Sequence, residues 1–153
     1  MRALPDALAR GAVVREAGRS MLVEAGAGSG KTTSLADRMV GTIRAGEARV
    51  QEMAAITFTR KAAGELRGRF QTALEKAFRE EKDPAAKERL GGALRRLELL
   101  FTGTIHAFCA RLLRERPVEA RVPPGFRELE QSEDELLRNR ALDETLASLH
   151  ARG

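Results

Sequence analysis

The segment AGAGSGKT, residues 25–32, constrains the fold of this chain more than any other. A glycine-rich turn that leads into a helix points backbone N–H groups inward, where they can bind a phosphate chain. Lys31 would reach the β- and γ-phosphates and stabilise their charge, and the Thr32 hydroxyl would ligate Mg²⁺. The residues predicted to bind the nucleotide are Ala25, Gly26, Ala27, Gly28, Ser29, Gly30, Lys31, Thr32 and Thr33.

The segments beside this loop favour an α/β fold. Residues 20–25 (SMLVEA) form a short apolar run between glycines, which is typical of a buried strand. After the loop, apolar side chains fall four residues apart on one helix face, and Gly46 is expected to end that helix. The apolar runs 53–58 and 101–105 are predicted as further strands. The alternation of strands and helices predicts a parallel sheet flanked by helices, and three strands would leave it incomplete.

The remaining segments are predicted to be mostly helical. A first helix is expected to start at Pro5-Asp6 and to run to about residue 17. An arginine-rich helix with a single apolar stripe follows Arg60, and Asp83-Pro84 is a turn that begins a new one. A helical pattern also covers residues 88–100, and another begins at Ile105 and is closed by Pro117. Ser132 and Glu135 have the spacing of a capping box that opens a last, acidic helix.

Composition excludes several classes of protein. The chain has 153 residues, enough to bury a core. Its longest charge-free run, residues 99–110, is too short to cross a bilayer, and no signal-peptide pattern opens the chain, so a cytoplasmic protein without membrane contact is expected. The single cysteine, Cys109, excludes an internal disulfide and is predicted to lie in the core. With only His106 and His150 beside it, a zinc cluster is excluded as well.

Charge is unevenly distributed along the chain. Residues 1–127 carry 24 basic and 15 acidic groups, whereas residues 128–153 carry 3 basic and 7 acidic groups. A basic body can attract nucleic-acid phosphates through its field and through counterion release. Because 22 of the 27 cations are arginine, the same excess can also reflect the composition of the source genome. Charge alone leaves both interpretations open.

The sequence also lacks a residue that a nucleotide hydrolase requires. Such an enzyme needs an acidic residue at the end of a second apolar strand, where it holds Mg²⁺ and positions water. None of the aspartates ends a predicted strand; they are Asp6, Asp37, Asp83, Asp134 and Asp143. The chain alone is therefore expected to bind a nucleotide without hydrolysing it.

Three segments resemble the N-terminal part of superfamily-one DNA helicases, the UvrD/RecB/AddA family. They are Leu22–Thr32 (LVEAGAGSGKT), Ala55–Phe70 (AITFTRKAAGELRGRF) and Thr102–Pro117 (TGTIHAFCARLLRERP). The last two resemble the family's motifs Ia and Ib, and the residues of the first and third segments favour the helicase–nuclease branch. The resemblance implies a P-loop NTPase fold, with residues 1–117 as the first part of the RecA-like motor domain 1A and 118–153 as the start of a helical insertion.

The resemblance also implies a function and its partners. It implies ATP-driven unwinding of, or translocation on, single-stranded DNA in recombination or repair, with ATP and Mg²⁺ as cofactors. Expected partners are single-stranded DNA, the remainder of a helicase chain and a helicase–nuclease partner subunit. Carried onto this sequence, the residues that would contact DNA are Thr57, Phe58, Thr59, Lys61, Thr104 and His106.

Some of these residues have alternative interpretations. Phe58 can stack on a base or pack in the core, and His106 can be a ligand or a capping, partly buried side chain. Arg67 and Arg69 are expected on a solvated face. The family's upstream glutamine, which reads adenine, is missing from the stretch LPDALAR, where Ala7 lies near its place, so adenine selectivity is not predicted.

Two other functions compete with the helicase interpretation. A small phosphate-loop kinase fits the length, but the predicted strand ends offer no acid to activate its acceptor. A non-catalytic nucleic-acid-binding module fits the basic body. Salt-sensitive binding of single-stranded oligonucleotide that persists without Lys31 would favour that module.

Overall fold

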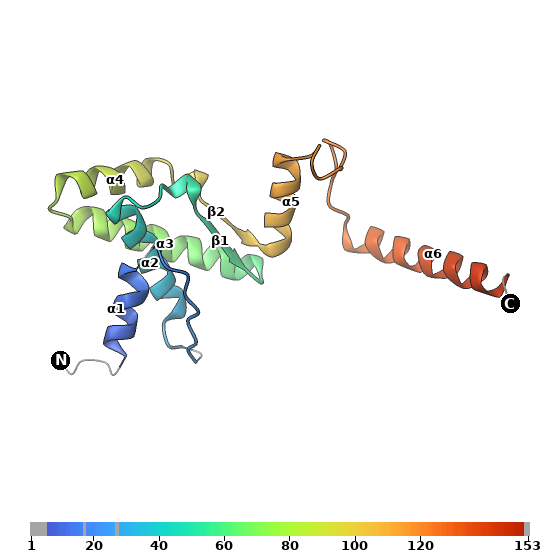
Figure 1. Cartoon of the computed structure of the whole chain (residues 1–153), viewed down its shortest axis with the longest axis horizontal. Coiled ribbons are helices and arrows are strands. Elements are labelled where there is room, and N and C mark those ends of the chain that lie inside the picture. Colours follow the sequence, from blue (N-terminus) through green and yellow to red (C-terminus); the bar gives the residue numbers. More distant parts are fainter. Residues whose placement is uncertain (1–5, 17, 27, 152–153) are drawn as a thin grey trace. The chain divides into compact units, whose positions relative to one another are not determined.

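The computed structural model describes residues 6–16, 18–26 and 28–151 and divides the chain into two compact units, 1–108 and 109–153. Figure 1 shows the elements in chain order. The helices are α1 (Ala7–Arg15), α2 (Lys31–Ala45), α3 (Arg60–Glu80), α4 (Pro84–Arg95), α5 (Ile105–Glu115) and α6 (Gln131–His150). The strands are β1 (Ala54–Thr57) and β2 (Phe101–Thr104), and 3₁₀ turns cover Val50–Glu52 and Leu97–Leu99.

The two strands form a parallel sheet. Ala54 pairs with Phe101 and Thr57 with Thr104, so the strands are in register along their whole length and their carboxyl ends meet at one edge. Parallel strands need a crossover connection, which α3 and α4 supply here. The predicted α/β class and two of the three predicted strands are therefore confirmed.

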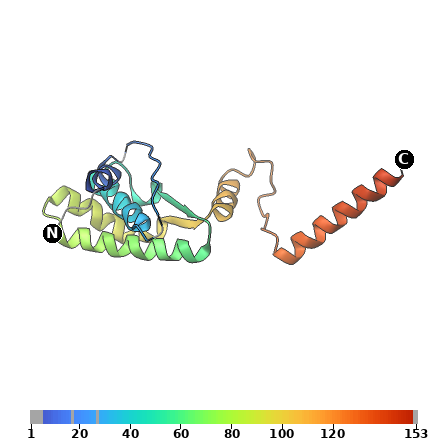
Figure 2. The same cartoon turned by 90° about the horizontal axis from the view of Figure 1, so that it is seen from below.

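The core of the first unit lies where α2, α3 and α4 meet the sheet. Each helix contributes an apolar face with a 3.6-residue period. Phe70, Leu74 and Leu90 are completely buried there, and Ala55 of β1 packs against them. Figure 2 shows α3 running beside α4. The stripe predicted along the arginine-rich helix is therefore the main wall of this core.

Local rules explain where these helices begin and end. Gly46 ends α2 with a φ of +80°, a left-handed conformation that glycine adopts without a Cβ clash. The Asp83 carboxylate accepts the N–H groups of Ala85 and Ala86 and caps α4, whose first residue is a proline. Both boundaries confirm the sequence prediction. Helix α4 ends at Arg95, and only a 3₁₀ turn covers 97–99 of the predicted 88–100 helix.

The predicted strand over residues 20–25 is wrong. These residues form no strand, and the side chains of Leu22 and Val23 are 87% and 44% exposed. A strand needs a neighbour that completes its ladder of hydrogen bonds. Within the described residues, β1 and β2 pair only with each other, so this apolar segment has no ladder to join.

Arg67 of α3 is not on a solvated face. Its guanidinium donates to the carbonyl oxygens of Leu97 (3.2 Å) and Leu100 (3.3 Å) and lies 3.5 Å from the Thr102 hydroxyl. These contacts join α3 to the segment that enters β2. Arg67 therefore has a structural role that the charge pattern did not indicate.

Two predictions about the second unit are wrong. Cys109 is exposed on α5. The buried residue of that helix is the next one, Ala110. The last helix begins two residues earlier than predicted, and its capping box joins Glu130 to Glu133 instead of Ser132 to Glu135. Arg127 pairs with the Glu133 carboxylate and, with the Glu130 N–H, holds the pKa of Glu133 down at about 2. This pair favours the observed register of the cap.

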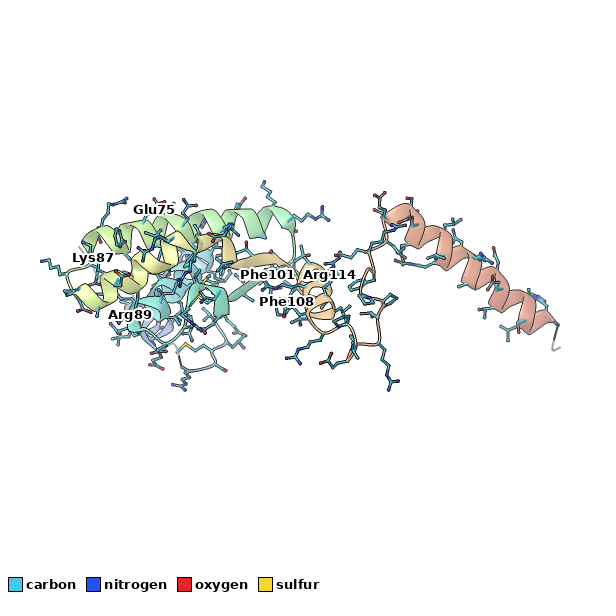
Figure 3. The ribbon with its side chains drawn as sticks, turned by 90° about the horizontal axis from the view of Figure 1, so that it is seen from above. Glu75, Lys87, Arg89, Phe101, Phe108 and Arg114 are labelled. Carbon is cyan, nitrogen blue, oxygen red and sulfur yellow. The ribbon has the colours of Figure 1, made fainter. Side chains whose placement is uncertain are left out.

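Aromatic contacts occur in both units. In the first unit, the centres of the Phe101 and Phe108 rings lie 5.4 Å apart and the ring planes are tilted by 56°. Figure 3 labels both side chains. In the second unit, the Arg114 guanidinium lies 5.0 Å from the centre of the Phe126 ring.

Of the helices described, none combines the length and the apolar character that a membrane span requires.

The buried carboxylate of Glu81 joins the end of α3 to α2. It accepts hydrogen bonds from the N–H groups of Lys82 and Asp83 and pairs with the Arg44 guanidinium at 2.5 Å. The Asp83 N–H and then Arg44 hold the pKa of Glu81 below its ordinary value of 4.5. This carboxylate therefore stabilises the fold fully above pH 4.5, and that stabilisation is lost as the pH falls through the lowered pKa.

Glu81→Gln is expected to remove this pH dependence. The free energy of unfolding is measured in urea between pH 7 and pH 3. On acidification the wild type should lose more of it than the variant, whose glutamine side chain takes up no proton. Glu80→Gln removes an exposed carboxyl from the same helix and is the matched control. Parallel stability curves for the wild type and Glu81→Gln would contradict the assignment.

Candidate functional site

Glycine conformations shape the loop that precedes α2. Gly30 occupies the N-cap position of α2 with a φ of +88°, and Gly28 has a φ of +74°. Residues with a side chain rarely adopt these values, so the sequence needs glycine at both positions. The N–H groups of the first turn of α2 are left without helical partners and carry the positive end of the helix dipole. Ala27, also predicted in this loop, lies outside the described residues.

The Lys31 side chain folds back over this loop. Its ammonium donates to the carbonyl oxygen of Gly26 at 2.8 Å and to that of Ala25. Lys31 is exposed, and both acceptors are uncharged. A phosphate oxygen carries charge and is therefore a stronger acceptor than either carbonyl. The ammonium already lies over the loop in which a phosphate chain would bind.

The hydroxyls that follow Lys31 differ in their partners. Thr32 is exposed on the first turn of α2, whereas the Thr33 hydroxyl lies 3.3 Å from the Arg69 guanidinium of α3. Mg²⁺ in nucleotide sites takes few protein oxygens and fills its shell with phosphate oxygens and water. The Thr32 hydroxyl suits such a site. Among the described residues, no cluster of three or more His, Cys, Asp or Glu side chains could hold a metal ion.

The loop also has features that the sequence did not reveal. The Ser29 hydroxyl is buried and, within the part of the chain described, has no hydrogen-bond partner. A cavity of about 600 Å³ opens beside Lys31; its lining includes Met21, Val23 and Leu35. Sequence analysis missed this cavity because residues 20–25 were expected to be inside a sheet.

A second group of predicted residues gathers at the carboxyl edge of the sheet. Thr57 and Thr104 are register partners at the ends of β1 and β2. Helix α3 begins at Arg60, soon after β1, and α5 begins at Ile105, directly after β2. The N-termini of two helices therefore follow the same edge, which is an arrangement suited to phosphate oxygens.

The threonines of this edge have structural roles. The Thr59 hydroxyl accepts the Ala62 N–H at 3.1 Å and caps α3, and the Thr104 hydroxyl accepts the Ala107 N–H at 3.3 Å. The Thr57 hydroxyl donates to the Thr59 carbonyl oxygen at 2.9 Å. These contacts fix the backbone of the turns that connect strand to helix.

The other side chains of this edge are exposed. Phe58 is 97% exposed, so the interpretation of this residue as core packing is wrong. Lys61 and His106 are exposed as well, so His106 is not a partly buried side chain. The edge therefore presents an aromatic ring and a cation beside two helix N-termini.

Comparison with known proteins identifies the family of this chain. The family described as the UvrD/REP helicase N-terminal domain matches residues 8–152. The chain is 37% identical over 138 residues to a protein of Bacillus velezensis named as an ATP-dependent helicase/nuclease subunit; the match covers 89% of this chain and 11% of that protein. It is 35% identical over 136 residues to the exonuclease/helicase subunit RexA of Lactococcus lactis subsp. cremoris, and this match covers 88% of this chain and 11% of that protein.

A third relative gives the same result. A protein of Streptococcus uberis, also named as an ATP-dependent helicase/nuclease subunit, is 37% identical over 123 residues, 80% of this chain and 10% of that protein. The chain thus spans about a tenth of the length of these curated relatives. The family match covers nearly the whole sequence, including the loop before α2 and both strands. The chain belongs to the UvrD/REP helicase N-terminal domain family.

Proposed function

We propose that this chain forms the ATP-binding part of an ATP-dependent DNA helicase with a P-loop NTPase motor fold. The observation that carries the proposal is the loop before α2, where two glycines adopt positive φ and Lys31 lies over the loop carbonyls. Residues 1–117 would belong to the first motor domain, and residues 118–153 would begin its helical insertion. The relatives that are named as helicase/nuclease subunits support this proposal.

Binding of Mg·ATP would use this chain's own groups in distinct ways. The first N–H groups of α2 would bind phosphate oxygens, and Lys31 would move from the loop carbonyls to the β- and γ-phosphates. The Thr32 hydroxyl would hold Mg²⁺, which neutralises phosphate charge when bound. Ser29 has a hydroxyl ready to take a new partner.

Binding without turnover is the expected behaviour of this chain. Strands β1 and β2 both end in threonine, at Thr57 and Thr104, so neither described strand carries an acid at its end. The aspartates lie in helices or at their N-caps; they are Asp6, Asp37, Asp83, Asp134 and Asp143. Hydrolysis would therefore need an acidic residue from outside this chain.

The carboxyl edge of the sheet is proposed to bind single-stranded DNA. Phosphates would lie at the N-termini of α3 and α5 near Lys61 and His106, while a base stacks on the exposed ring of Phe58. Further proposed partners are the remainder of a helicase chain and a helicase–nuclease partner subunit, since relatives are named as subunits. A cytoplasmic location remains part of this proposal.

Phe58→Ala is expected to weaken binding of a labelled single-stranded oligonucleotide about tenfold, because one base loses its stacking partner. Fluorescence anisotropy at low salt measures the change. Phe58→Tyr keeps the aromatic ring and should bind like the wild type. Unchanged affinity in Phe58→Ala would remove Phe58 from the DNA site, and binding of the wild type that does not weaken with salt would contradict phosphate contacts altogether.

A further inference from the structure

Arg10 of α1 reaches the loop before α2. Its guanidinium Nη2 donates to the Ser29 carbonyl oxygen at 3.0 Å, although the two residues are 19 positions apart in the sequence. Its Nη1 would lie 3.5 Å from a Cβ placed on Gly30, so the guanidinium lies against the N-cap of α2. Figure 1 shows α1 beside the segment that leads into α2.

Asp6 holds the Arg10 side chain in this position. The Asp6 carboxylate accepts from Arg10 Nε at 2.9 Å and lies 2.8 Å from Nη2. Asp6 occupies the N-cap position of α1 but makes no capping hydrogen bond, so its carboxylate is directed to Arg10. The hydrogen bond from Arg10 holds the pKa of Asp6 below its ordinary value of 3.8.

The bond to Ser29 sets the orientation of a neighbouring N–H group. Among the described residues all peptide bonds are trans, and in a trans peptide the C=O and N–H groups point in opposite directions. The Ser29 carbonyl and the Gly30 N–H belong to the same peptide group. Because Arg10 fixes the carbonyl on one side, the Gly30 N–H is fixed on the opposite side.

We infer that Arg10 is a positioning residue of the phosphate loop: held by Asp6, it fixes the Ser29–Gly30 peptide in the orientation from which the Gly30 N–H meets a nucleotide phosphate. This inference rests on the proposed nucleotide binding. A loop that is already ordered loses less conformational freedom when a ligand binds. Arg10 therefore strengthens phosphate binding through the loop and not through contact with the ligand.

Three variants of the full chain test this role. Arg10→Ala is expected to weaken binding of ADP and of inorganic pyrophosphate about tenfold in isothermal titration calorimetry, because the Ser29–Gly30 peptide would then have to be ordered when the ligand binds. Arg15→Ala removes the same charge from an exposed position of α1 and controls for net charge. Arg10→Lys restores one donor without the forked geometry and should recover part of the affinity.

Asp6→Asn gives the sharpest discrimination. Removal of a negative charge near an anion site would by itself strengthen binding of pyrophosphate, whereas release of Arg10 is expected to weaken it about threefold. The melting temperature without ligand should remain close to that of the wild type, and the Gly30 amide resonance should shift in Asp6→Asn and Arg10→Ala but not in Arg15→Ala.

The outcomes separate this inference from the proposed function. A wild-type chain that binds neither ADP nor pyrophosphate would overturn the proposed function and the role of Arg10 with it. If the wild type binds and Arg10→Ala and Arg15→Ala lose the same amount of affinity, then Arg10 contributes only its net charge. Tighter pyrophosphate binding in Asp6→Asn would likewise overturn the inference while nucleotide binding stands.

Discussion

Replacement of Lys31 by alanine is expected to weaken binding of Mg·ATP about 100-fold, since a charged hydrogen-bond donor to phosphate is lost. In the structure the Lys31 ammonium donates to the Ala25 and Gly26 carbonyls, which are uncharged and therefore weaker acceptors than phosphate oxygens. Titration with a fluorescent ATP analogue measures the affinity. The unfolding midpoint of the variant should stay close to that of the wild type, because Lys31 is exposed.

Lys76→Ala is the matched control for this experiment. It removes the same charge from α3, so its affinity for Mg·ATP should match that of the wild type. Full nucleotide affinity in Lys31→Ala would contradict the phosphate-loop assignment. A wild-type chain that binds single-stranded oligonucleotide but no Mg·ATP would instead favour a nucleic-acid-binding module.

Phe70→Ala is expected to lower the free energy of unfolding by about 3–5 kcal/mol, because it removes a large side chain from a packed core and leaves a cavity. Phe70 is completely buried among α2, α3 and α4. Urea unfolding followed by circular dichroism measures the loss. A loss of this size is comparable to the whole stability of a small domain, so the variant can be largely unfolded at room temperature.

Phe58→Ala is the matched control, because it removes the same kind of side chain from an exposed position. Phe58 is 97% exposed, so its removal should change the free energy of unfolding by less than about 0.5 kcal/mol. Phe70→Leu retains most of the buried volume and should remain folded with a smaller loss than Phe70→Ala. Equal stability of the Phe58 and Phe70 alanine variants would contradict the described core.

Elements whose determinants lie within a few residues were predicted from the sequence. Gly46 ends α2 and Asp83 caps α4 because a left-handed glycine and a carboxylate cap act on adjacent backbone groups. The apolar stripe of α3 was predicted for a similar reason, since its period follows from the helix itself. The glycines of the loop before α2 belong to this class. Gly28 and Gly30 adopt a positive φ, and the preference for glycine at such a φ depends on the residue itself.

Features that depend on distant partners were not predicted. Residues 20–25 carry an apolar pattern, but a strand also needs an adjacent edge, and the described sheet has none for them. Arg67 looked like a solvated cation until its contacts with Leu97 and Leu100, 30 and 33 positions away, were visible. The same holds for Arg10 and Ser29, whose contact no spacing rule indicates.

The start of α6 shows why a helix boundary can differ from the predicted one. Glu130 with Glu133 has the same spacing as Ser132 with Glu135, but residue preference favours serine as the cap, so the sequence predicted the second pair. The structure selects the first pair, where Arg127 also binds the Glu133 carboxylate. The observed boundary therefore differs from the one that residue preference predicted, and it has an ion pair that residue preference does not take into account.

The most direct test of nucleotide binding at this loop is the set of backbone amide resonances of the chain as ADP is added. If the ADP phosphates bind at the N-terminus of α2, the amide resonances of Gly28, Gly30 and Lys31 should shift and reach saturation. The amide resonances of α6 should shift less. Resonances of these three residues that stay in place while others shift, or no shift anywhere at millimolar ADP, would contradict the assignment of residues 25–33 as the nucleotide phosphate site.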